Sequence, residues 1–216
     1  IGQPQIAEAI VAAGDADLCG MTRALICDPQ MPAKTRDGNL DEIRACIACN
    51  QACIGRAHAG MPISCIQYPE SGREIEYGVL SPTKSPKSVM VVGGGPAGLK
   101  AAAVAAERGH RVTLYEASDQ LGGQALLAQK LPGREEFGGI IQNLVREAEQ
   151  AGVSLLTRSP ADVATIKAAE PDALILATGA VPYALEIEGA DEAHVVDAWA
   201  ALNGANIGNA VVIAHW

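Results

Sequence analysis

The sequence has few aromatic residues, no long apolar run and no cluster of basic residues. Of its 216 residues only 3% are aromatic, with a single Phe. A membrane-spanning helix needs about 20 consecutive apolar residues, and no stretch approaches that length. The net charge of -9 repels nucleic-acid phosphates and anionic lipid, because no Lys/Arg cluster offsets it. We therefore expect neither nucleic acid nor a membrane as a partner.

The first residues contain neither an initiator Met nor a basic segment followed by an apolar one, which would be a secretory signal. We expect a cytoplasmic protein and a chain that begins inside a longer one. In a reducing compartment, closely spaced cysteines indicate a metal or catalytic site rather than disulfides. The hydrophobic share of 49% and the 23 glycines are ordinary for a globular nucleotide-binding α/β protein.

The first third of the sequence has an irregular hydrophobic pattern. We expect a helix over 4–13, a buried parallel strand over 16–20, and a short helix from 22 that stops at Asp28 and Pro29. Residues 46–65 contain Gly and Pro, which favour a loop with short turns. The stretch 81–88, SPTKSPKS, has the composition of a linker between domains.

Beyond the linker, the pattern becomes regular, with apolar runs alternating with helical stretches. Strands are expected at 89–92, 111–116, 153–156 and 173–178, separated by helices at 96–108, 138–151 and 161–169. A last apolar run, 209–216, is expected to be a further strand. This alternation predicts right-handed βαβ units, a mostly parallel sheet and an α/β fold.

A glycine motif follows the first of these strands. Gly93, Gly95 and Gly98 have the G-x-G-x-x-G spacing and enclose Pro96 and Ala97 at the start of a helix. The first glycine permits a tight turn, the second lets the backbone approach a pyrophosphate, and the third allows close helix–strand packing. The free amides at the helix N-terminus favour the negative phosphates. The motif predicts a dinucleotide site.

An acidic residue completes this motif at the end of the second strand. Glu116 lies 18 positions after Gly98, where its carboxylate can accept hydrogen bonds from ribose hydroxyls. The same charge repels a 2′-phosphate, so the site favours FAD or NAD over NADP. Two later stretches of small residues either lie against the nucleotide or are ordinary turns: LGGQ, with Gly122, Gly123 and Gln124, and ATG, with Thr178 and Gly179.

Four of the six cysteines lie within twenty positions, in the spacing Cys46-x2-Cys49-x3-Cys53-x11-Cys65. Thiolates spaced in this way wrap a compact iron–sulfur cluster, and we favour a [4Fe-4S] cluster. Structural zinc more often takes two C-x-x-C pairs with a longer spacer, so zinc and uncoordinated thiols are the alternatives.

The remaining residues near the cluster have simpler interpretations. Cys19 and Cys27 are expected to fill the core as small hydrophobic residues. His58 is interpreted as a surface histidine. Arg44 and Arg56 either offset the cluster's negative charge or are solvated.

These stretches together resemble a known family. The segments ADLCGMTRALICDPQMPAKTRDG, IRACIACNQACIGR and GMPISCIQYPESGRE, with the glycine motif, are similar to the multidomain Old Yellow Enzyme family. The members it resembles are 2,4-dienoyl-CoA reductase, trimethylamine dehydrogenase and the dimethylglycine or N-methylproline demethylase-like proteins. The resemblance implies three parts. Residues 1–45 would be the last strand and helix of an FMN-binding TIM barrel, 46–80 the [4Fe-4S] segment, and 81–216 a Rossmann-like FAD/NAD(P)-binding domain.

The resemblance also implies roles for individual residues. Cys46, Cys49, Cys53 and Cys65 would ligate the cluster. The glycine motif with Glu116, the 122–124 turn and 178–179 would contact the adenine dinucleotide. Gly20, Thr22 and Arg23 would hold the FMN phosphate, although the family usually has Gly at the position of Thr22. No residue is identified as a catalytic acid or base.

The function implied is electron transfer in an FMN, FAD and [4Fe-4S] oxidoreductase. NAD(P)H would supply electrons for the reduction of an activated alkene of the enoyl-CoA type. In the alternative, a demethylating amine dehydrogenase, electrons would flow the other way, to an electron-transfer protein. Two further hypotheses are a zinc-stapled nucleotide-binding module without redox function and a subunit like the small chain of glutamate synthase. The expected partners are a small-molecule substrate and NAD(P)H, and a homo-oligomer is compatible with the sequence.

Overall fold

A four-stranded parallel sheet organises the second half of the chain. The computed structural model describes residues 1–183 and 186–213. The sheet has the order β3-β2-β1-β4 and every pair in it is parallel. Its strands are β1 (Ser88–Val92), β2 (Arg111–Tyr115), β3 (Ser154–Leu156) and β4 (Ala173–Leu176). Because all strands run the same way, their carboxyl ends meet at one edge.

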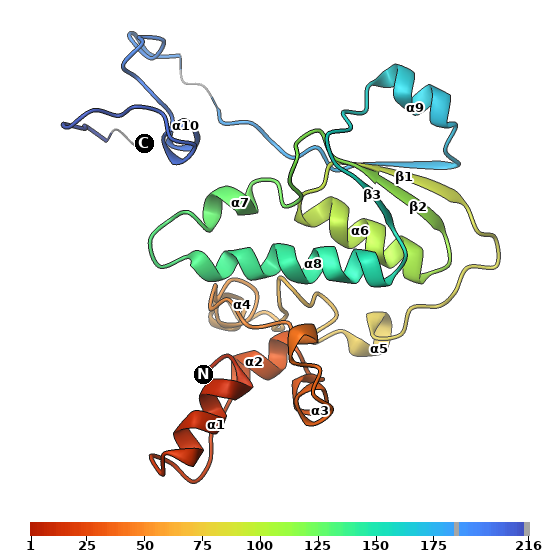
Figure 1. Ribbon diagram of the computed structural model, residues 1–216, viewed down its shortest axis with the longest axis vertical. Coiled ribbons are helices and arrows are strands. Elements are labelled where there is room, and N and C mark those ends of the chain that lie inside the picture. The colour runs from red at the N-terminus through yellow and green to blue at the C-terminus, as the bar shows by residue number, and fades with distance from the viewer. Residues whose placement is uncertain (184–185, 214–216) are drawn as a thin grey trace.

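Helices cover the sheet as right-handed crossovers require. The helices α6 (Pro96–Glu107) and α8 (Gly138–Gln150) join β1 to β2 and β2 to β3, and both lie on one face (Figure 1). The next connection returns from β3 to β4, on the far side of β1. Its helix, α9 (Val163–Ala169), lies on the other side of the sheet (Figure 1).

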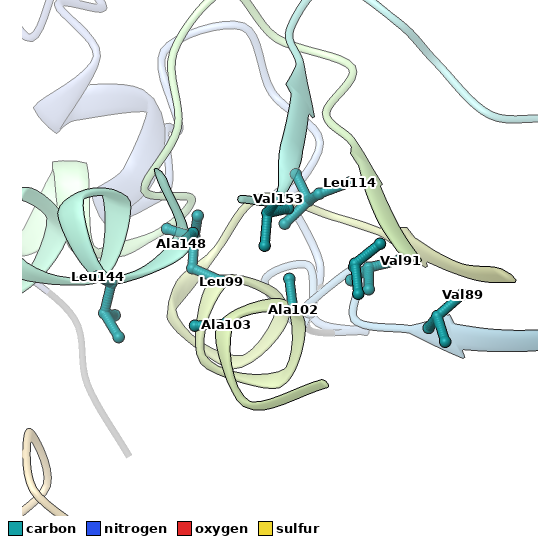
Figure 2. Packing of buried hydrophobic residues seen from close by; sticks show 10 residues of the cluster. Val89, Val91, Leu99, Ala102, Ala103, Leu114, Leu144, Ala148 and Val153 are labelled. Carbon is teal, nitrogen blue, oxygen red and sulfur yellow. The ribbon is translucent and has the colours of Figure 1, made fainter. Parts of the chain in front are cut away.

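The main core lies between the sheet and the pair α6 and α8. Figure 2 shows Val91 and Leu114 of the strands facing Leu99 of α6. These three side chains are fully buried, each worth roughly 1.5–3 kcal/mol. Ala102 and Ala103 keep α6 close to the strands. The apolar runs of the sequence therefore form a parallel sheet, as predicted, and its central strands β1 and β2 are the buried ones.

The first part of the chain consists of short helices joined by turns. A small core of Ala24, Met31 and Ile43 holds it together. This part lies against α8 on the side away from the sheet (Figure 1). Its elements are α1 (Pro4–Ala12), α2 (Thr22–Cys27), α3 (Met31–Arg36), η1 (Leu40–Glu42), α4 (Ile54–His58) and α5 (Glu74–Tyr77). The other short elements are α7 (Ala125–Ala128), η2 (Glu135–Phe137) and α10 (Ala198–Leu202).

Most elements expected from the sequence are confirmed, but the predictions of two strands are wrong. Residues 16–20 form no strand and Leu18 is 88% exposed, because a strand needs a hydrogen-bonded neighbour and none of the strands in the described residues lies beside it. Residues 209–213 also form no strand, and Val212 is 94% exposed. The remainder of that prediction, 214–216, falls outside the described residues. The helix α3 was not predicted from the sequence. Its Pro32 lies in the first helical turn, where proline is tolerated.

None of the helices in the described residues combines the length and the apolar character that a membrane span requires.

Candidate functional site

The loop after β1 needs glycine at two positions for reasons internal to the protein. Gly93 has φ +109°, and a Cβ there would collide with the carbonyl oxygen of Ala177. A Cβ on Gly98 would collide with the carbonyl oxygen of Gly93. The predicted tight turn and close helix–strand packing are therefore confirmed. Gly94 was missed by the sequence reasoning, although it is one of three consecutive glycines: a Cβ there would meet Leu121.

Gly95 has no such internal reason to be glycine. Its φ of -75° and ψ of 179° suit any residue, and the nearest atom to an added Cβ is the Cα of Gly123, at 3.9 Å. Gly123 itself has φ +52°, and its Cβ would lie 3.1 Å from the Cα of Gly95. Two bare backbone segments thus face each other across space that a side chain would fill. A dinucleotide needs this kind of cradle for its pyrophosphate.

Glu116 lies directly after β2 and holds the glycine loop in place. Its carboxylate accepts hydrogen bonds from the backbone N–H of Gly94, at 2.7 Å, and of Ser118, at 2.8 Å. Burial works to raise the pKa of Glu116, but the hydrogen bonds from Ser118 and Gly94 outweigh it and lower the pKa. The group is therefore a stable carboxylate. Its remaining lone pairs are available to hydroxyl donors such as those of a ribose.

The other predicted nucleotide-binding residues lie at the same edge of the sheet. Thr178 and Gly179 follow β4, the neighbour of β1. The side chain of Gln124 donates to the carbonyl oxygen of Ala180 at 2.8 Å, which links the 122–124 turn to the loop after β4. The strand order reverses between β1 and β4, and ligands of open α/β sheets bind beside such a reversal.

The four clustered cysteines lie around one cavity. Cys46, Cys49, Cys53 and Cys65 line it together with Arg23, Gln67 and a fifth cysteine, Cys27. Among the described residues, no three His, Cys, Asp or Glu side chains converge closely enough to hold a single metal ion.

The backbone around Cys49 has an uncommon conformation. Ala48 and Asn50 have φ of 54° and 57°, in the left-handed region. For alanine this conformation costs roughly 1–2 kcal/mol. The carbonyl of Asn50 accepts from the N–H of Gly55 at 2.8 Å, and its side chain accepts from Arg23 at 2.7 Å. Strain held in place by such contacts is common in loops that clamp a ligand.

Two of the four motif thiols have shifted pKa values. A hydrogen bond with the Cys27 thiol, together with the backbone N–H groups of Gln67 and Tyr68, lowers the pKa of Cys65 to about 6. Burial raises the pKa of Cys49. Cys65 therefore has the strongest thiolate character, and thiolates are the form that binds metal.

An ion-pair network joins the cysteine segment to α8. Arg44 lies 2.6 Å from Glu147, its guanidinium is 4.9 Å from the Tyr68 ring centroid, and its backbone N–H donates to Asp28. Lys100 of α6 pairs with Glu147 at 3.1 Å. Burial opposes the charge on Glu147, but Arg44 and Lys100 outweigh it and lower its pKa. Arg44 is thus neither solvated nor simply a counter-charge.

The structure also shows where the other residues discussed in the sequence analysis lie. His58 is exposed, as predicted. Cys27 is buried, as predicted, but it lines the cysteine cavity, which its distance from the motif in sequence did not indicate. Gly20 and Thr22 are exposed at the start of α2. Arg23 donates to the side chain of Asn50 and lines the cysteine cavity.

Comparison with known proteins agrees with this geometry. Residues 87–213 match the family described as pyridine nucleotide-disulphide oxidoreductase. The chain is 42% identical over 207 residues to an NADH oxidase of Thermoanaerobacter brockii, covering 94% of this chain and 32% of that protein. It is 42% identical over 215 residues to an N,N-dimethylglycine/sarcosine dehydrogenase of Chromohalobacter salexigens, covering 95% of this chain and 31% of that protein.

A solved structure shows the same arrangement of elements. The complex of 2-naphthoyl-CoA reductase with 2-naphthoyl-CoA superposes with a TM-score of 0.88 at 36% identity, covering 94% of this chain and 31% of that one. The chain thus spans about a third of the length of these relatives. The resemblance found in the sequence is confirmed.

Proposed function

Since the chain belongs to the pyridine nucleotide-disulphide oxidoreductase family, we propose that it is the electron-transfer part of a flavin and iron–sulfur oxidoreductase. FAD occupies the edge of the sheet at 93–98, 116, 122–124 and 178–179. A [4Fe-4S] cluster occupies the cavity of Cys46, Cys49, Cys53 and Cys65. The observation that carries the proposal is that all four cysteines of the motif line one cavity, on a segment packed against α8, the helix that covers one face of the parallel sheet.

The residues present fit both groups. Gly95 and Gly123 leave open backbone where a pyrophosphate is bound, and Glu116 is held as a carboxylate beside it. The four motif cysteines line one cavity, and four thiolates are the number that a cubane takes, one for each iron. Zinc would need its four donors about 2.3 Å from one point. Backbone N–H groups already donate to Cys65, as they do to cluster sulfurs.

The proposal divides the chain into three parts. Residues 1–45 complete a TIM barrel that binds FMN, with Gly20, Thr22 and Arg23 toward its phosphate. Residues 46–80 hold the cluster, and 81–216 hold FAD. When bound, these groups would carry electrons from NAD(P)H through FAD and the cluster to FMN, for reduction of an activated alkene. The protein's own contribution is to fix the order of these groups and to exclude water. The ion pair of Arg44 with Glu147 contributes to the first of these, because it holds the cluster segment against α8.

A second candidate is a demethylating amine dehydrogenase, in which electrons flow in the opposite direction. The similarity to a dehydrogenase named for N,N-dimethylglycine and sarcosine favours it, as the similarity to 2-naphthoyl-CoA reductase favours the first. In both candidates the substrate would be bound at the barrel, so the chain's own side chains do not choose between them.

Anaerobic reduction experiments test both candidates on the purified holoprotein. NAD(P)H is expected to bleach the flavin absorption, and an enoyl-CoA is expected to restore it. In the second candidate N,N-dimethylglycine bleaches the flavin and NAD(P)H does not. If neither donor changes the flavin or iron–sulfur spectrum, while dithionite does, both candidates are wrong.

A further inference from the structure

The side chain of Gln67 joins the two ends of the cysteine motif. Gln67 lies two positions after Cys65, and its side-chain amide donates to the carbonyl oxygen of Ala45 at 2.9 Å. Ala45 directly precedes Cys46. The segments that carry the first and the last cysteine of the motif are therefore held together by a hydrogen bond that depends on one side chain.

The third cysteine is held to the last one through the backbone instead. The backbone N–H of Ser64, directly before Cys65, donates at 2.8 Å to the carbonyl oxygen of Ala52, directly before Cys53. Any residue except proline supplies such a donor, so this bond does not depend on which side chain stands at position 64. A substitution at Gln67, by contrast, removes the bond to the first cysteine's segment.

The amide of Gln67 is buried, and both of its ends have partners. Gln67 is only 5% exposed and lines the cysteine cavity. Its nitrogen also donates to Cys27 Sγ at 3.3 Å, and its oxygen accepts from the side-chain amide of Asn143, on α8, at 3.2 Å. Because the nitrogen faces acceptors and the oxygen faces a donor, these bonds fix the amide in one orientation.

Asn143 connects this amide to the dinucleotide-binding part. On α8 it lies two positions after Ile141, which packs against the turn at 122–124. The packing is close, since a Cβ on Gly122 would lie 2.7 Å from Ile141 Cδ1. Within one helical turn, α8 therefore contacts both the turn assigned to FAD and the side chain that links two cysteine segments.

We propose that Gln67 is a positioning residue for the cluster: it holds the segments of Cys46 and Cys65 together and, through Asn143, fixes both to the helix that supports the flavin turn. This inference rests on the proposed function. A cluster needs its sulfur ligands at set positions, and the groups that orient such ligands affect both metal retention and the cluster's electronic properties. Removal of the amide should loosen the two outer ligands while all four thiols remain.

The test compares Gln67→Leu with Gln51→Leu in the holoprotein. Gln51 lies inside the motif and is exposed, so its substitution is the matched control. In Gln67→Leu, iron release to a chelator under anaerobic conditions is expected to be roughly tenfold faster, because the bonds to Ala45 and Asn143 are both lost. The EPR spectrum of the reduced cluster is expected to change shape, because its ligands are reoriented. Gln51→Leu is expected to change neither.

A second variant separates the two bonds and decides the question if Gln67→Leu does not fold. Asn143→Ala removes the bond to α8 and leaves the bond to Ala45, so iron release is expected to be roughly threefold faster. Gln142→Ala, at the exposed neighbouring position, is its control and is expected to have no effect. Circular dichroism shows whether each variant is folded.

Three outcomes overturn the inference and leave the proposed function intact. The first is iron release and an EPR spectrum in Gln67→Leu that match those of Gln51→Leu. The second is a lower thermal stability of Gln67→Leu with both readouts unchanged, which would make Gln67 a purely structural residue. The third is equal iron release in Asn143→Ala and Gln142→Ala. Wild-type protein without an iron–sulfur signal would instead overturn the proposed function, and the inference with it.

Discussion

Arg44 and Glu147 are 103 positions apart in the sequence and form an ion pair of 2.6 Å. The arginine belongs to the segment that leads into the cysteines, and the glutamate lies on α8, which packs against the sheet. Their side chains are only 15% and 18% exposed. The pair therefore joins the two parts of the molecule to which we assign different redox groups.

Removing this pair should weaken the packing of the cysteine segment on α8. Glu147→Ala leaves Arg44 half-buried and without its partner, so the free energy of unfolding should fall by about 1–3 kcal/mol, between the values for surface and buried pairs. Chemical denaturation followed by circular dichroism measures it. Asp37→Ala removes an exposed pair, with Arg36, and is expected to change little. Equal effects of the two substitutions would contradict the assignment of Glu147 as a clamp.

The same pair predicts a pH dependence of stability. Arg44 and Lys100 lower the folded-state pKa of Glu147 below its ordinary value of 4.5. Its contribution to stability is therefore complete above the unfolded pKa and is lost as the pH falls through the lower folded-state pKa. Wild-type protein should lose stability faster than Glu147→Gln below about pH 4.5. Denaturation midpoints between pH 3 and 7 measure it, and parallel curves would contradict the prediction.

Two glycines of the nucleotide motif should respond differently to alanine. The Cβ of Gly95→Ala meets no protein atom closer than 3.9 Å, so the free energy of unfolding without nucleotide should change by less than about 0.5 kcal/mol. Its affinity for FAD should nevertheless fall at least about tenfold, because the methyl group fills the cradle. Gly98→Ala should cost about 1–3 kcal/mol in the absence of nucleotide. Thermal unfolding and FAD titration of the two apo variants measure these effects. If Gly95→Ala lowers the stability but not the affinity for FAD, the pyrophosphate does not bind at this position.

The left-handed residue in the cysteine loop gives a further prediction. Ala48→Gly relieves an unfavourable φ of 54° and should stabilise the protein by up to about 1 kcal/mol. Ala57→Gly, in the helix α4, should instead destabilise by about 1 kcal/mol. Opposite signs in denaturation experiments support the strained loop. Destabilisation by both substitutions would show that Ala48 is not strained.

Much of the nucleotide-binding part was predictable because its signals are local. The alternation of apolar runs gave β1 to β4 and the helices between them, and the spacing of Gly93, Gly95 and Gly98 placed the turn. The predicted strand at 16–20 failed for a physical reason: an apolar run becomes a strand only where another strand offers hydrogen bonds.

The cysteine site was predictable in its members and not in its surroundings. The spacing of the four cysteines marked them, and all four line one cavity. Cys27 reaches this cavity only through tertiary packing, and no local pattern distinguishes it from a core-filling residue. The same is true of Glu147, whose partner lies about a hundred positions away.

The central claim is that the four clustered cysteines hold an iron–sulfur cluster beside a flavin-binding sheet. Chemical analysis of anaerobically purified protein for iron, acid-labile sulfide, zinc and flavin tests it most directly. We predict about four irons and four sulfides per chain together with FAD, and loss of the iron but not of the FAD in Cys49→Ser. Zinc in place of iron, or full iron content in Cys49→Ser, would contradict the account.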